Sequence, residues 1–202
     1  MSNEAAARSN KISILLIIAI PLLGVVITTL YYFWVVNYNI KLGSTNVGTL
    51  IAPPKQIGDI TLLQENHETY RWNSKGDKWT FLVVGLDECD DDCRQQLYLT
   101  RQIRLALGKY MPRIEDTYLS LNGTVSEETR HWMQQEHPQL QLLTTDSDVA
   151  RAWFQQKEPQ LDLLNSATFY VVDPMGWVMM YYTPEQDYKA VIKDMKFLLK
   201  NS

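Results

Sequence analysis

The only two cysteines of the chain, Cys89 and Cys93, stand where a strand pattern gives way to a helical one. The preceding run from Trp79 to Leu86 is apolar and rich in β-branched residues, which is typical of a core strand. A disulfide needs Cβ atoms about 3.8 Å apart, a spacing that positions i and i+4 of a regular helix do not provide. We therefore expect Cys89 in the loop and Cys93 in the first helical turn, with one sulfur reachable from solvent.

Strand and helix patterns alternate on both sides of this corner. The turn signature D-P-M-G at 173–176 separates two apolar runs near the C-terminal end. The predicted elements are strands at 57–63, 70–72, 79–86, 117–121, 140–143, 168–172 and 178–182, and helices at 94–110, 126–135, 146–156 and 186–200. This order predicts an α/β fold, a thioredoxin-like three-layer sandwich over residues 56–202.

An apolar segment precedes the predicted domain. Residues 12–36 contain no charged side chain and would form a helix long enough to cross a hydrocarbon core of about 30 Å. Aromatic residues crowd its far end at 31–34, where rings favour the headgroup level, and Arg8 and Lys11 precede it. The sequence therefore predicts a cytoplasmic N-terminus at 1–11, a transmembrane helix at 12–36 and a tether at 37–55, in preference to a cleaved signal peptide.

This orientation predicts a single-pass protein of the inner (cytoplasmic) membrane with its folded domain in the periplasm or outside the cell, where disulfides persist. The formal net charge is −4, and the sequence shows no basic patch, so nucleic acid is disfavoured as a partner. Zinc is disfavoured as well, because His67, His131 and His137 are far from the cysteines in sequence. We expect His131 and His137 to be solvated.

Three roles remain open for the two thiols. They can exchange with a partner's disulfide, bind Cu(I), which prefers soft sulfur ligands, or form a static disulfide. The aspartates at 90–92 disfavour a neighbouring thiolate, whereas a helix N-terminus favours it. The same aspartates are also typical of a plain helix start that complements the helix dipole. The acid-rich loop argues against a strongly oxidising disulfide donor.

The segment from Trp79 to Leu121 resembles the Sco/SenC group of membrane-anchored copper chaperones for cytochrome c oxidase, which share an N-terminal anchor, a thioredoxin-like domain and a C-x-x-x-C copper pair. Patches at 48–54, 98–109 and 173–182 are similar to short bacterial membrane proteins associated with cytochrome oxidase assembly. The resemblance implies that Cys89 and Cys93 bind Cu(I) or perform a thiol-disulfide step. It also implies two kinds of partner, namely the membrane and either a cytochrome c oxidase subunit or another copper or thiol protein.

Three differences separate the chain from the families that it resembles. Asp90 stands where the Sco group has proline after the first cysteine, and Asn165 stands near the position of its copper-binding histidine. Because an amide is a poor copper ligand, this favours Cu(I), or no metal, over Cu(II). Ser166 and Ala167 replace the proline of thioredoxin-like oxidoreductases, which weakens general disulfide exchange. The sequence thus predicts a Sco-like accessory protein of oxidase assembly, with a thiol-disulfide reductase or an assembly scaffold as alternatives.

Overall fold

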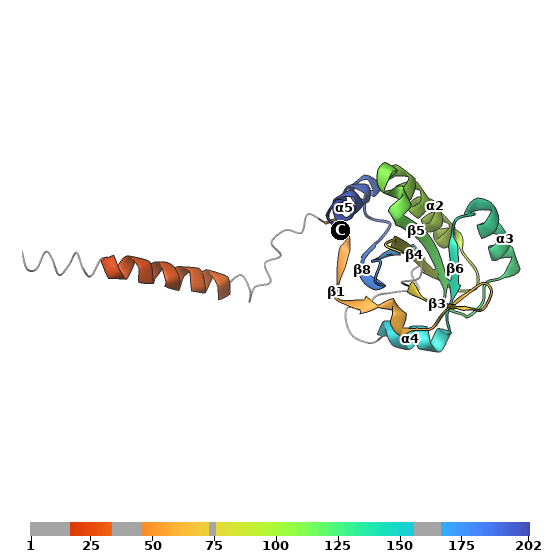
Figure 1. The fold of residues 1–202 in the computed structure, drawn as a ribbon, viewed down its shortest axis with the longest axis horizontal. Helices are drawn as coiled ribbons and strands as arrows, with labels where there is room; N and C mark the ends of the chain where they lie inside the picture. The colour runs from red at the N-terminus through yellow and green to blue at the C-terminus, as the bar shows by residue number, and fades with distance from the viewer. Residues whose placement is uncertain (1–16, 34–45, 73–75, 156–166) are drawn as a thin grey trace, which may run out of the picture. The chain divides into compact units, whose positions relative to one another are not determined.

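The structure is a computed structural model that describes residues 17–33, 46–72, 76–155 and 167–202 (Figure 1). It divides into two units, Met1–Ser44 and Thr45–Ser202. In the first unit residues 17–33 are helical, and their apolar side chains are exposed. Within the described residues, no helix reaches the length and apolarity that a membrane span requires. The predicted N-terminus at 1–11, both ends of the predicted 12–36 helix and the tether up to residue 45 lie outside the described residues.

The second unit is built on one eight-stranded sheet with the strand order β1-β8-β7-β4-β5-β6-β2-β3. Strand β4 pairs in parallel with β5, which pairs in parallel with β6, whereas β7 and β8 add to the other side of β4 in antiparallel fashion. The strands are β1 (Thr49–Gln56), β2 (Leu62–Gln64), β3 (Thr69–Tyr70), β4 (Trp79–Gly85), β5 (Ile114–Ser120), β6 (Gln141–Thr144), β7 (Phe169–Val172) and β8 (Trp177–Tyr182).

Helices cover both faces of this sheet. They are α2 (Asp91–Ala106), α3 (Glu127–Glu136), α4 (Ser147–Gln155) and α5 (Tyr188–Asn201), with short 3-10 helices at Ile57–Asp59 and Gly108–Arg113. Helices α2 and α5 lie on one side of the sheet and α4 on the other (Figure 1). The predicted order of alternating strands and helices, closed by a hairpin and a last helix, is confirmed.

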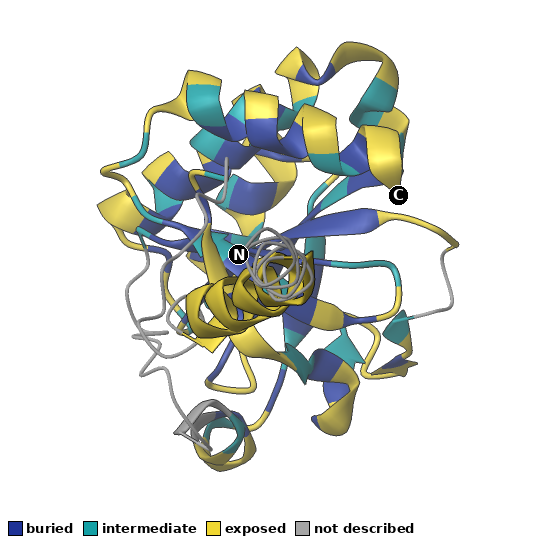
Figure 2. Ribbon diagram, turned by 90° about the vertical axis from the view of Figure 1, so that its left-hand side faces the viewer, coloured by how far each residue is buried: buried dark blue, intermediate teal, exposed yellow. Residues whose placement is uncertain are grey.

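The buried side chains form two clusters, one on each face of the sheet. In β4, Phe81 and Val83 join the cluster under α2 and α5, whereas Leu82 and Val84 join the cluster on the α4 side. All of β4 is buried, which explains its uninterrupted apolar sequence. The helices show the complementary pattern, with exposed outer faces above buried inner ones (Figure 2). Strand β4 is therefore packed on both faces up to the corner at its carboxyl end.

The N-terminal edge of the sheet differs from the prediction. Residues 49–55 were predicted to belong to the tether, but Thr49–Gln56 forms β1, which pairs antiparallel with β8. Its register shifts between Leu50 and Lys55, where Pro53 and Pro54 have no amide hydrogen to donate. The strand predicted at 57–63 begins instead as a 3-10 helix at Ile57–Asp59. The edge strand β1 was not predicted because its two prolines lie in a Gly- and Asn-rich stretch that resembles a linker.

Candidate functional site

The two cysteines form a disulfide at the carboxyl end of β4, with their Cα atoms 5.3 Å apart. Cys89 lies in the loop before α2, and Cys93 lies in the first turn of that helix. This placement confirms the prediction from disulfide geometry. The described chain contains no free cysteine, so all of its thiol chemistry is located at this corner.

The aspartates beside the cysteines start the helix. Asp90 is the N-cap of α2, and its carboxylate accepts a hydrogen bond of 2.8 Å from the backbone N–H of Cys93, while Asp91 and Asp92 lie in the first turn. Carboxylates here complement the positive end of the helix dipole. The Asp90 carboxylate therefore satisfies one of the unpaired N–H groups at the start of α2.

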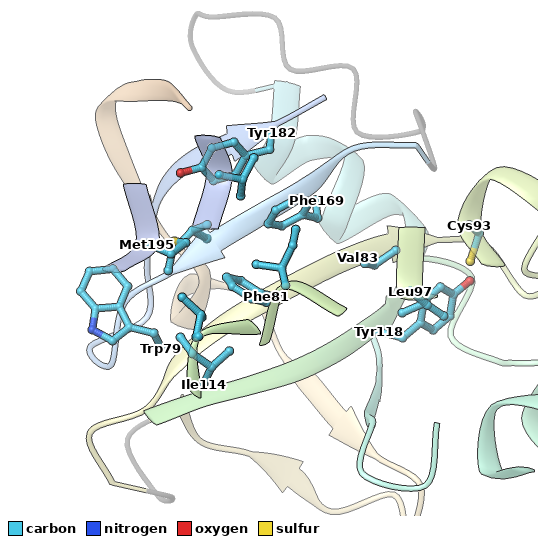
Figure 3. Packing of buried hydrophobic residues seen from close by; sticks show 14 of the residues in the cluster. Trp79, Phe81, Val83, Cys93, Leu97, Ile114, Tyr118, Phe169, Tyr182 and Met195 are labelled. Carbon is cyan, nitrogen blue, oxygen red and sulfur yellow. The ribbon is translucent and has the colours of Figure 1, made fainter. Parts of the chain in front are cut away.

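The expectation that one sulfur is reachable from solvent is wrong for the disulfide form. Cys89 is 4% exposed and Cys93 is 1% exposed, and both belong to the core cluster that also contains Leu97 of α2 and Met133 of α3. In Figure 3, Cys93 lies at one end of this cluster, beyond Val83 and near Leu97. Thr129 and Met133 of α3 take part in this packing, the first through a hydrogen bond to Cys89 and the second as a member of the cluster, so the corner joins segments far apart in the sequence.

Three contacts hold the cysteine corner, and two of them reach α3. The Arg94 Nε donates to the Cys89 carbonyl at 3.1 Å, and the guanidinium lies 5.0 Å from the ring centroid of Trp132. The Cys89 N–H in turn donates to the Thr129 Oγ1 at 3.4 Å. We call the pair of Arg94 and Trp132 the latch. Sequence reasoning missed it, because Trp132 reads as an ordinary aromatic residue of α3.

The loop between β4 and the disulfide is held by hydrogen bonds from two sides. The Tyr118 hydroxyl donates to the Leu86 carbonyl at 2.7 Å, and the Ser126 N–H donates to the Asp87 carbonyl at 2.9 Å. Burial, together with the negative charges of Asp90 and Asp87, raises the pKa of Tyr118. A Cβ at Gly85 would collide with the Tyr118 ring, which accounts for glycine there. These contacts therefore connect the corner to β5 and to the start of α3.

A second polar cluster lies further along α2. The Arg104 guanidinium forms an ion pair of 2.6 Å with Asp116 of β5. Burial raises the pKa of Asp116 to about 6, although Arg104 opposes that shift. His137 is buried rather than solvated as predicted, because its ring packs 5.2 Å from that of Trp132, and burial lowers its pKa. We interpret the Arg104–Asp116 ion pair as a structural contact that is separate from the cysteine corner.

Potential metal ligands are few. Across the described ranges of the chain, no three side chains of the His, Cys, Asp or Glu type converge on a point where a metal ion could bind. Asn165, which replaces the histidine of the Sco pattern, lies outside the described residues. The donor set that the structure describes is therefore two sulfur atoms.

The fold and its C-x-x-x-C corner define a thioredoxin-like domain. A family model described as "Transmembrane-like, thioredoxin-like, C-terminal domain" matches residues 79–202. The chain belongs to this family. The comparison with curated proteins gives no match.

Several solved structures share the fold. Copper-bound ScoI of Arabidopsis thaliana is 15% identical with a TM-score of 0.56, and the match covers 74% of this chain and 98% of that one. Copper-bound yeast Sco1 is 15% identical with a TM-score of 0.57, covering 79% and 96%. Apo Sco1 of Thermus thermophilus is 20% identical with a TM-score of 0.54, covering 80% and 98%. The predicted resemblance to Sco/SenC proteins is confirmed at the level of the thioredoxin-like fold.

Proposed function

We propose that this chain is a membrane-anchored accessory protein for cytochrome c oxidase assembly, and that its reduced cysteine pair carries Cu(I) as cargo. The observation that carries the proposal is the closeness of the Cys89 and Cys93 sulfurs at the carboxyl end of β4. Two further facts support it, namely the fold shared with copper-bound Sco1 proteins and the soft character of sulfur ligands.

Copper loading requires the disulfide to open first. Two electrons and two protons from a partner dithiol convert the disulfide into two thiols, and the partner becomes a disulfide. Each thiol then loses its proton when it binds Cu(I). Because Cys89 and Cys93 are buried, both steps need the corner to open, and we expect the hydrogen bond from Arg94 to the Cys89 carbonyl to break when it does. Copper would then be held between two thiolates, a coordination that suits Cu(I).

The proposal includes the anchor at 12–36, with the domain in the periplasm or outside the cell. Its support is the charge-free sequence of that segment and the helical, apolar and exposed residues 17–33. A bilayer supplies the apolar surroundings that such side chains need. An oxidising compartment is also where a Cys89–Cys93 disulfide persists until a partner reduces it.

An anaerobic Cu(I) titration of the full chain in detergent micelles, against a chromophoric Cu(I) chelator, tests the copper role. We expect about one Cu(I) per reduced chain and none for the oxidised chain. Cys89→Ser and Cys93→Ser should each abolish tight binding. Met175→Leu is the matched control, because it removes an exposed thioether and leaves both thiols in place. Failure of the reduced wild type to compete with the chelator would remove the copper role.

A thiol-disulfide reductase that acts on an oxidase subunit is the second candidate. It is favoured by the observed disulfide, because the same two sulfurs can cycle between disulfide and dithiol. One thiolate would attack the partner's disulfide to form a mixed disulfide, and the other cysteine would displace the reduced partner. Replacing the resolving cysteine by serine should trap the mixed disulfide. Normal oxidase assembly with both cysteines replaced would favour the scaffold alternative over both roles.

A further inference from the structure

The outward face of α5 carries a stripe of lysines. They recur at intervals of four, three and four residues, so they follow one side of the helix: Lys189, Lys193, Lys196 and Lys200. All four are exposed, whereas Val191, Met195 and Leu199 point into the core. The sequence showed no basic patch because other residue types separate these lysines along the chain. We call the four lysines the α5 stripe.

The stripe has few charged neighbours and an apolar flank. In the described part of the chain, no carboxylate forms an ion pair with a stripe lysine. Asp187 caps the helix through the Lys189 N–H at 3.2 Å, and the nearby Glu185 also precedes the helix. Phe197 is 63% exposed beside the stripe, and Tyr188 is 49% exposed at its start. Exposed rings beside lysines on an amphipathic helix are typical of a membrane-surface helix.

The first described residues of the folded domain form hydrogen bonds with α5 and with the residues just before it. The Asp194 carboxylate of α5 accepts hydrogen bonds from the backbone N–H of Val47 at 2.5 Å and of Gly48 at 3.2 Å. The Gln186 side chain donates to the Val47 carbonyl at 3.1 Å. Asp194 is 9% exposed, so its charge is used inside the domain and does not offset the stripe. Val47 and Gly48, at the start of the second unit, therefore lie against α5.

We propose that α5 docks on the surface of an anionic phospholipid bilayer, with the stripe lysines on the headgroup phosphates and Phe197 in the interfacial region. Charge complementarity favours this occupant, because the stripe is positive on a chain whose formal net charge is −4. The inference rests on the proposed anchor only for bringing a bilayer close to Val47. Docking would hold the domain against the membrane and restrict the directions in which the cysteine corner meets a partner.

The test uses the full chain in vesicles and a protease site inserted into the tether within residues 37–44. After cleavage, the released domain is separated from the vesicles by flotation. Vesicles are made of phosphatidylcholine alone or of phosphatidylcholine with phosphatidylglycerol, at low and at high salt. We compare the wild type with Lys193→Glu/Lys196→Glu/Lys200→Glu and with the charge-preserving arginine triple at the same positions. Equal thermal unfolding midpoints for the three proteins show that all are folded.

We expect the cleaved wild-type domain and the arginine triple to stay on anionic vesicles at low salt and to leave at high salt. The glutamate triple should bind at least about 100-fold more weakly, because each lost lysine weakens binding to an anionic surface about fivefold and each glutamate adds repulsion. Release of the wild type at low salt, or equal retention on phosphatidylcholine alone, overturns the proposal. If the wild-type domain leaves the vesicles at low salt and the glutamate triple still loses oxidase assembly, the docking proposal is overturned. The stripe would then bind an acidic protein partner.

An anchor failure gives a different result from a docking failure. A full chain that is extracted from vesicles before cleavage contradicts the anchor. The docking of α5 is then decided by the same flotation comparison, with the protein added to preformed vesicles. A chain that resists extraction but whose cleaved domain floats free contradicts only the docking of α5.

Discussion

The disulfide should become easier to reduce when the latch is removed. Arg94→Met keeps the aliphatic stem but loses both the donor to the Cys89 carbonyl and the cation over Trp132. A hydrogen bond from a charged group contributes about 1.5 kcal/mol, and a partly exposed cation–π contact about 0.5 kcal/mol. Together they oppose opening of the corner by about 2 kcal/mol, which corresponds to an open population about 30-fold larger in the variant.

Reduction by dithiothreitol reports this opening, because both sulfurs are buried in the closed form. The oxidised full chain in micelles is mixed with excess reductant, samples are quenched with acid, and free thiols are alkylated and counted by mass. If opening and closing are fast relative to attack, the rate follows the open population. We therefore expect Arg94→Met to be reduced up to about 30-fold faster than the wild type.

Lys109→Met is the matched control. The Lys109 ammonium lies 5.0 Å from the Tyr110 ring, the same separation as in the latch, but Lys109 follows the opposite end of α2 from the cysteines. Its loss should leave the reduction rate unchanged. A rate for Arg94→Met within twofold of the wild type, or equal acceleration in both variants, would refute the reasoning that the latch covers the disulfide.

Further variants address the surroundings of the corner. Asp90→Ala should lower the free energy of unfolding by about 1 kcal/mol in urea titrations, because it removes the cap on the Cys93 N–H; an unchanged midpoint would contradict this. Tyr118→Phe leaves the Leu86 carbonyl without its donor and should lower the free energy of unfolding by about 1 kcal/mol in the same titrations, so an unchanged value would contradict the role of this hydrogen bond. Burial raises the pKa of Asp116 to about 6, above its unfolded value. The contribution of Asp116 to the free energy of unfolding is therefore complete below pH 4 and declines by about 3 kcal/mol as the pH rises through 6. Asp116→Asn should flatten this part of the stability profile, and an equal slope in both proteins would count against it.

Local patterns in the sequence predicted most elements of the domain. The apolar run of β4, the helical spacing of α2 and the D-P-M-G turn are each encoded within a few residues, so they could be recognised without tertiary contacts. Disulfide geometry likewise placed Cys89 and Cys93 on opposite sides of the helix start. Strand β1 escaped because its two prolines resemble a linker, and its pairing depends on β8, which is far away in sequence.

By itself the sequence determined the strand-to-helix corner, the pair of sulfurs at it and the apolar segment before the domain, because these follow from local spacing and composition. Only the tertiary structure decided that the disulfide is buried in one cluster with Met133 of α3 and that Arg94 meets Trp132. The same holds for the contact of Val47 with Asp194, which locates the start of the domain on α5. The physical reason is that each of these features joins residues on separate elements, and their approach depends on how the helices pack on the sheet.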